Sequence, residues 1–189
     1  MEREILLTGI GGQGVQLAAQ VIARAAIREG RHVMSLGTYG GTMRGGNTDS
    51  TLILGAEPIS SPPIVARSWA GIGAHPRYWG AVRAKLREGG IAVWNADLFG
   101  AEGDAGAARA LPVSATTLAS RLGSAQAASL VLVGALAGAT GIVGLDALVA
   151  AMEESLPPYR REHAPKNADA LRAGHDAAPR NLVSAWEAA

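Results

Sequence analysis

The stretch LLTGIGGQGVQLAAQVIA, residues 6–23, constrains the fold more than any other part of the chain. An apolar run typical of a strand buried on both faces ends in glycines at positions 9, 11 and 14, which fit the pattern G-x-G-x-x-G. Apolar residues then recur with helical spacing, at 15, 18, 19, 22, 25 and 26. Strand, glycine turn and helix in this order predict the first part of a βαβ unit, with the turn at the carboxyl edge of a sheet.

The rest of the chain continues the alternation of strand and helix patterns. We expect strands over 4–9, 31–36, 50–55, 68–74, 91–95 and 109–113. We expect helices over 15–27, 76–88, 115–122, 124–139 and 144–155, and one or two surface helices in the last thirty residues. This predicts a three-layer, Rossmann-like α/β domain with a mostly parallel sheet and a helical C-terminal part. A single domain over 1–175, followed by a C-terminal tail helix over 176–189, accounts for the length.

Composition excludes several classes of protein. The formal net charge of +1 gives no strong field for nucleic acid or an anionic membrane surface. The absence of cysteine excludes disulfides, a thiolate nucleophile, Cys-ligated zinc and an iron–sulfur cluster held by this chain alone. The start MEREILLTG lacks the apolar core of a signal peptide. We therefore expect a cytoplasmic protein that neither binds nucleic acid nor inserts into a membrane.

One long segment carries no charge at all. Residues 122–145 contain small side chains and a G-x-x-x-G pair at Gly134 and Gly138. In lipid this pattern marks a helix-pairing face, whereas in a water-soluble domain it marks a helix buried on all sides. No second candidate span and no flanking cluster of Lys or Arg accompany it, so the buried helix is favoured. Because burial without charge needs a covering surface, we expect this helix to make a close contact with another subunit.

The glycine turn indicates an anion site. Where a helix follows such a turn, free backbone N–H groups and a partial positive charge face the ligand. The acidic residue that binds a dinucleotide's ribose is missing, since Ser35, Leu36 and Gly37 stand at its expected place. A turn that served only packing would need neither the additional glycine at position 12 nor the amide side chain of Gln13, so these residues favour a binding role.

A second glycine-rich stretch, residues 37–50, follows the second expected strand. Within it two glycines come directly after Arg44, whose guanidinium can present a bidentate fork to phosphate or carboxylate. If the first two strands are parallel neighbours, both loops converge on one crevice. Taken alone, this stretch is equally consistent with a solvated arginine on a flexible loop that has no binding role.

Residues for acid–base or metal chemistry do not assemble in the sequence. The four histidines have neither HxH nor HxxxH spacing, and no G-x-S-x-G elbow is present. His75, at a strand-to-helix junction, is more typical of a turn or cap than of a catalyst. The charged groups at 153–154 and 160–162 are typical of solvated helix faces. The chain thus offers an anion-binding crevice with no expected catalytic or metal-binding residue.

Four stretches, taken in order, carry a family resemblance. They are GIGGQGVQLAAQVIARAA, YGGTMRGGNTDSTLIL, ISSPPIV and LREGGIAVWNADL. Over residues 3–175 the chain resembles the gamma subunit or domain of 2-oxoacid:acceptor oxidoreductases. That family includes pyruvate, 2-oxoglutarate, 2-oxoisovalerate, indolepyruvate and phenylglyoxylate enzymes. The pairing of GxGGQG with an RGG about thirty residues later is the specific part of the resemblance.

The resemblance implies a place in a larger enzyme that oxidatively decarboxylates a 2-oxoacid to an acyl-CoA. Thiamine diphosphate, magnesium and [4Fe–4S] clusters would belong to partner chains: an alpha subunit, a thiamine-binding beta subunit and a ferredoxin-like delta subunit. Coenzyme A would lie at the glycine-rich edge of this chain. The residues implied to face it, or an adjoining subunit, are Gly9, Gly11, Gly12, Gln13, Gly14, Tyr39, Gly40, Arg44, Gly45, Gly46 and Asn47.

Two alternatives stay open from the sequence. One is a free-standing Rossmann oxidoreductase that binds NAD(P) or FAD, which the missing ribose acid disfavours. The other is a purely structural scaffold, with coenzyme A held entirely by other subunits. The identity of the 2-oxoacid, the electron acceptor (ferredoxin, or NAD through a partner) and the stoichiometry are not encoded in recognisable residues of this chain.

Overall fold

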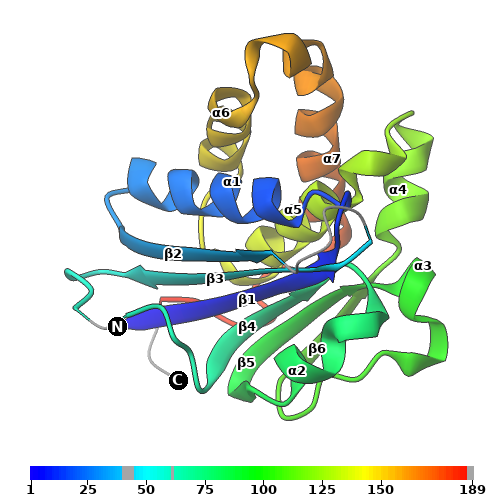
Figure 1. Ribbon diagram of the computed structural model, residues 1–189. Coiled ribbons are helices and arrows are strands. Elements are labelled where there is room, and N and C mark those ends of the chain that lie inside the picture. Colours follow the sequence, from blue (N-terminus) through cyan, green and yellow to red (C-terminus); the bar gives the residue numbers. More distant parts are fainter. Residues whose placement is uncertain (40–44, 61, 187–189) are drawn as a thin grey trace.

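The computed structural model, in which residues 1–39, 45–60 and 62–186 are described, contains one six-stranded sheet in the order β2-β3-β1-β4-β5-β6 (Figure 1). The strands are β1 (Glu2–Ile10), β2 (His32–Tyr39), β3 (Asn47–Gly55), β4 (Ser68–Gly73), β5 (Leu86–Asn95) and β6 (Arg109–Val113). The α-helices are α1 (Val15–Arg28), α2 (Trp79–Arg83), α3 (Ala96–Phe99), α4 (Ala115–Arg121), α5 (Ala128–Thr140), α6 (Leu145–Ser155) and α7 (Ala164–Ala177). The 3₁₀ turns are η1 (Pro76–Tyr78), η2 (Gly100–Glu102), η3 (Ala125–Ala127) and η4 (Pro158–His163).

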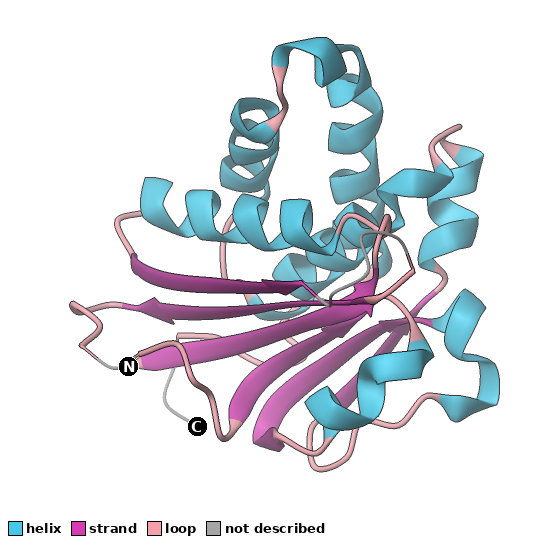
Figure 2. Ribbon diagram, viewed as in Figure 1, coloured by secondary structure: helices cyan, strands magenta, loops and turns pink. Residues whose placement is uncertain are grey.

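Helices cover both faces of the sheet (Figure 2). On one face the main core joins Ile5 and Leu7 of β1 to α1, α5, α6 and α7. The alternating residue, Leu6, belongs to a smaller core on the opposite face, built around Trp79, Trp94 and Phe99 beside α2 and α3. This alternation is the period-two pattern of a strand buried on both sides. The predicted α/β fold with a mostly parallel sheet is confirmed.

The first two strands along the chain, β1 and β2, are not neighbours in the sheet as the sequence predicted. β3 lies between β1 and β2 and runs antiparallel to both, whereas β4, β5 and β6 continue parallel from β1. Much of the stretch 37–50 expected as loop is strand, because β2 extends to Tyr39 and β3 begins at Asn47. The connection of residues 40–46 is too short for a parallel crossover, which needs about a dozen residues, so a hairpin forms.

The helix expected over 76–88 is much shorter. It consists of η1 and α2, which ends at Arg83, and β5 then begins at Leu86. The register between β4 and β5 shifts at this point: Ser68 pairs with Leu86, and Ala70 pairs with Ile91. Gly90 sits against the backbone of Trp69 with no room for a Cβ. Residues 86–88, which were expected to be helical, belong instead to β5 because that strand pairs closely with β4.

The α5 helix within the uncharged segment is covered by other helices of this chain, not by another subunit as expected. The α5 helix packs closely against α7, and a Cβ on Gly134 or Gly138 would overlap backbone carbonyl oxygens of Leu171 and His175. The G-x-x-x-G pair thus allows two helices of one domain to approach closely. Among the residues placed by the structure, no helix is both long and apolar enough to cross a membrane.

The C-terminal segment runs back along the domain instead of forming a further helix. The α7 helix ends at Ala177, and residues 178–186 carry turns and bends only. The Ala185 carbonyl accepts a hydrogen bond from Arg3 Nε, and its N–H donates to Thr140 O. Trp186 donates to Ile142 O and stacks under Arg31, 3.8 Å from the guanidinium carbon to the ring centroid. The tail helix expected over 176–189 is therefore absent from its described part.

Candidate functional site

The glycine turn lies between β1 and α1 and leaves the start of α1 uncapped. Gly14 is the N-cap residue and has a left-handed backbone (φ 75°), with no side-chain hydrogen bond to the helix and no acidic residue in the first turn. A Cβ at Gly14 would lie 2.9 Å from Ser129 Oγ, so this glycine packs against α5, not against the strand. The free N–H groups of the first turn remain available to an anion.

Gln13 makes two hydrogen bonds within the glycine turn. The side-chain amide oxygen of Gln13 accepts a hydrogen bond from the Ile10 N–H at 3.0 Å, and the backbone N–H of Gln13 donates to Ile10 O. A Cβ at Gly9 would lie 2.8 Å from the same amide oxygen. Gln13 therefore closes the turn from inside, and the exposed Gly12 forms the tip.

The second predicted loop is placed only in part. Gly40 and Arg44 lie outside the described residues, and Tyr39 is placed by its backbone pairing with Thr48. Gly46 O accepts a hydrogen bond from Gly11 N at 2.9 Å, so the two loops do meet. Gly45 is exposed, and Asn47 pairs with Ile10 at the end of β1. The expected convergence thus comes from β3 lying next to β1, not from two parallel neighbours.

Asp49 of β3 links β1, α1 and the start of its own strand through hydrogen bonds. Its carboxylate accepts hydrogen bonds from Thr8 Oγ1 at 2.6 Å and from Asn47 Nδ2 at 2.7 Å, and its backbone carbonyl accepts one from Gln16. Asn47 Oδ1 is the one buried side-chain oxygen or nitrogen without a partner in the placed part of the chain. The ends of β1 and β3 and the start of α1 are thereby held in one arrangement.

The Thr8–Asp49 hydrogen bond should contribute measurably to stability. Thr8 is buried, and hydrogen bonds to a charged group are worth about 1.5–3 kcal/mol, so we expect Thr8→Val to lower the free energy of unfolding by about that amount. Urea denaturation measures the change. Thr51→Val is the matched control on β3, since no hydrogen bond of the Thr51 hydroxyl is seen in the described structure. Equal effects of both substitutions would contradict this role for Asp49.

At the position of the missing ribose acid, Gln16 of α1 contacts Gly37 of β2. The Gln16 amide oxygen packs against Gly37 at the end of β2 and accepts a hydrogen bond from Ser50 Oγ at 2.9 Å. A dinucleotide ribose would therefore find no carboxylate there, and the Gln16 amide lies where a side chain at Gly37 would project.

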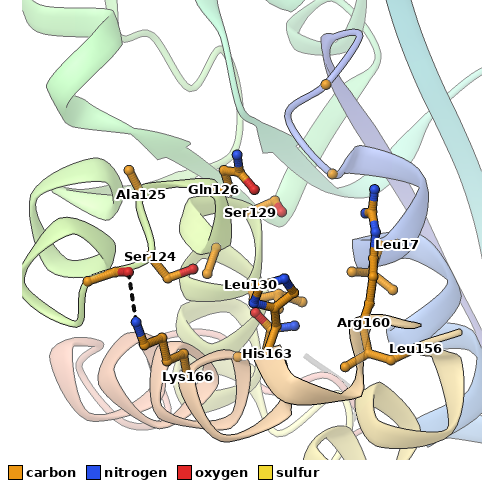
Figure 3. A pocket seen from close by; sticks show the side chains of 15 residues that line it. Leu17, Ser124, Ala125, Gln126, Ser129, Leu130, Leu156, Arg160, His163 and Lys166 are labelled. Atoms are coloured by element: carbon orange, nitrogen blue, oxygen red, sulfur yellow. Dashed lines mark hydrogen bonds between the residues drawn. The ribbon is translucent and has the colours of Figure 1, made fainter. Parts of the chain in front are cut away.

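A cavity of about 430 Å³ opens on the α1 side of the glycine turn (Figure 3). Its walls come from the turn, the start of α5 and the segment from η4 to α7. The lining residues are Gly12, Gly14, Leu17, Gly123, Ser124, Ala125, Gln126, Ala127, Ser129, Leu130, Leu156, Arg160, His163, Lys166 and Asn167. A smaller, mostly apolar pocket of about 220 Å³ shares Gly12, Ala125, Gln126 and Ser129 with it. Of the predicted site residues in the described part, only Gly12 and Gly14 line the larger cavity.

Three basic side chains contribute to this cavity. Arg160 and His163 come from η4, and Lys166 from the first turn of α7, where its Nζ donates to Gly123 O at 3.2 Å (Figure 3). No carboxylate is among the residues that line the cavity. Residues 160–162 are exposed, as predicted for a solvated face, and Lys166 was not predicted as a site residue. Nothing local in the sequence shows that η4 lies opposite the glycine turn.

Helix orientation adds to this positive charge. The first turns of α1, α5 and α7 all border the cavity, and none of these turns contains an acidic residue or a side-chain cap. Each helix dipole directs partial positive charge towards its N-terminus. The donor set of backbone N–H groups, hydroxyls and cations is suited to phosphate and not to a metal ion. No cluster of three metal-ligating side chains occurs within the part of the chain that is described.

The remaining site predictions concern His75, which caps a turn. Its Nδ1 accepts a hydrogen bond from the Arg77 N–H at 3.2 Å at the start of η1. This is the role expected from its position between strand and helix.

Comparison with known proteins identifies the family. A family model described as pyruvate ferredoxin/flavodoxin oxidoreductase matches residues 4–177. The chain belongs to this family. It is 29% identical to the 2-oxoglutarate synthase subunit KorC of Methanothermobacter marburgensis over 185 residues, covering 93% of the chain and 96% of that subunit. It is 30% identical to the ketoisovalerate oxidoreductase subunit VorA of Methanothermobacter thermautotrophicus, covering 77% of the chain but only 30% of VorA.

Solved structures agree with this assignment. The gamma subunit of a keto/oxoacid ferredoxin oxidoreductase from Geobacter sulfurreducens matches with a TM-score of 0.79 and 26% identity, covering 93% of this chain and 95% of that one. A 2-oxoglutarate:ferredoxin oxidoreductase from Magnetococcus marinus, solved with coenzyme A bound, shares the fold at 18% identity with a TM-score of 0.82; the match covers 97% of this chain and 33% of that one. The prediction of a gamma-type subunit of 2-oxoacid oxidoreductases is confirmed, and no comparison supports a free-standing dinucleotide-binding enzyme.

Proposed function

We propose that this gamma subunit binds the phosphates of coenzyme A in the cavity beside the glycine turn, within a complex that converts a 2-oxoacid to an acyl-CoA. The observation that carries the proposal is the basic cavity itself. An uncapped helix start and three basic side chains face one space that no carboxylate lines. The Magnetococcus marinus relative, solved with coenzyme A, supports the choice of ligand.

The residues present fit a phosphate-bearing ligand. Hydroxyls of Ser124 and Ser129 and the amide of Gln126 add neutral donors opposite the cations of η4 and α7. The adjoining apolar pocket, which reaches Leu98 and Leu132, is suited to an uncharged part of the same molecule. Arg44 and the second loop remain part of the proposal as a further anion contact, as the family resemblance implies.

Reaction chemistry is proposed to lie elsewhere in the complex. Thiamine diphosphate supplies carbanion stabilisation and iron–sulfur clusters carry electrons singly, and both are assigned to alpha, beta and delta partner subunits. This chain would orient coenzyme A and keep its phosphates fixed while the thiol reaches the acyl group. A cytoplasmic location is part of the same proposal.

Hydrogen–deuterium exchange in the assembled complex tests the proposal. Adding coenzyme A should slow exchange in peptides covering residues 9–17 and 160–167, because phosphate binding ties down backbone N–H groups there. Pantetheine, which lacks the phosphates, should leave these peptides unchanged. If coenzyme A protects other subunits but neither of these segments, the chain is a structural scaffold and the proposal is wrong.

A further inference from the structure

The two edges of the sheet differ in how they are protected. β6 is a strand of only five residues and contains Pro112, which has no N–H to offer to another strand. β2, at the other edge, has eight residues, no proline and no Asp, Glu, Lys or Arg. Its sole partner in the described structure is β3. An edge of this kind is a template for pairing with another strand.

Exposure confirms that the β2 edge is open. Ser35 and Leu36 are exposed, the latter with 45% of its surface accessible. The strand spans roughly 26 Å at the usual rise per residue. Figure 1 shows that α1 runs above this edge, and the contact of Gln16 with Gly37 fixes which side of α1 faces β2.

The adjoining side of α1 is uncharged as well. Steps of four, three and four residues place Gln20, Ala23 and Ile27 in the same row of the helix as Gln16. Gln20 is exposed, and Ile27 has 58% of its surface accessible. In a chain where 17% of residues are charged, a neutral strand edge and a neutral helix row stand next to each other.

We propose that β2 pairs antiparallel with β2 of a second copy of this chain, about a twofold axis near Leu36. An axis normal to the sheet places side chains of the same face opposite one another and brings the two α1 helices together on one side. The patch contacts itself, as a twofold interface requires, and its neutrality avoids the like-charge repulsion that a charged edge would meet across the axis. Because β6 is blocked, the assembly closes at two copies and does not grow into a fibre.

Charge substitution at Leu36 gives a test with internal rescue. The purified full-length chain should be dimeric in sedimentation equilibrium, and Leu36→Glu or Leu36→Lys should each raise the dimer dissociation constant by about tenfold or more. Mixing the two variants should restore the dimer, since opposite charges then meet at the axis. Ile27→Glu, on α1, should weaken the dimer without touching the strand.

Ala110→Glu is the matched control, because Ala110 is an exposed residue on the opposite edge strand. It should leave the dissociation constant unchanged. Circular dichroism of every variant should match that of the unchanged chain. A chain that stays monomeric throughout a dilution series, or Leu36 variants that dimerise like the unchanged chain, would overturn the proposal. So would a strand from a different subunit found on β2 in the assembled complex.

Discussion

Replacing Arg160 and Lys166 together with alanine should raise the dissociation constant for coenzyme A by about a hundredfold or more. Both side chains line the cavity, and in the proposed complex each would form a charge-assisted hydrogen bond with a phosphate. Such bonds are worth about 1.5–3 kcal/mol, or roughly tenfold or more in affinity. Isothermal titration of the assembled complex measures the change. The KM for coenzyme A should rise with it, while binding of pantetheine should not change.

Arg161→Ala provides the control for this double substitution. Arg161 is exposed and lies next to Arg160 on the same 3₁₀ turn, but it does not line the cavity. It should therefore leave the affinity for coenzyme A unchanged, apart from a small effect of net charge. If the Arg161 variant loses as much affinity as the double variant, general electrostatics explains binding and the phosphate contacts do not.

Much of the fold follows from local patterns, and the exceptions have a physical cause. The α1 helix was predicted within one residue because its apolar spacing and the glycine turn agree. The β2–β3 hairpin was not predicted, because glycines near residues 40–46 indicate a turn without saying whether the following strand returns parallel or antiparallel. The absence of charged residues from α5 predicted that this helix is buried. A pattern of apolar residues does not, however, identify which other helix covers α5.

The site shows the same division. The glycine turn could be predicted because the residues that form it, G-x-G-x-x-G, follow one another closely in the sequence. The basic wall was missed because Arg160 and Lys166 are brought to the turn by the packing of α7 against α5, about 150 residues further along the chain. Charged residues after a Pro-Pro pair, as at 157–158, are typical of a solvated turn unless the tertiary fold is known. The sequence therefore predicted the glycine turn of the proposed anion site but not the basic side chains opposite it.

Among the glycines that the structure describes, Gly174 has the least room for a side chain, and its substitution should cause a large loss of stability. A Cβ at Gly174 of α7 would overlap the Val131 carbonyl of α5 and lie 3.0 Å from the Ala135 nitrogen. Helix propensity alone favours Gly174→Ala by up to about 1 kcal/mol. Separating two packed helices costs more, so we expect a net loss of about 3 kcal/mol and a fall in melting temperature of about 10 °C. Differential scanning calorimetry measures both quantities.

Gly80→Ala isolates the packing effect from propensity. Gly80 lies within α2 and is exposed, and apart from its chain neighbours and its own helix backbone no atom lies within 4 Å of where its Cβ would be. Here only propensity acts, so the substitution should leave stability unchanged or raise it by up to about 1 kcal/mol. Gly134→Ala, which meets the Leu171 carbonyl from the other helix, should instead destabilise the domain as Gly174→Ala does. If both alanine substitutions in the α5–α7 contact are as well tolerated as the one in α2, close backbone approach is not what these glycines provide.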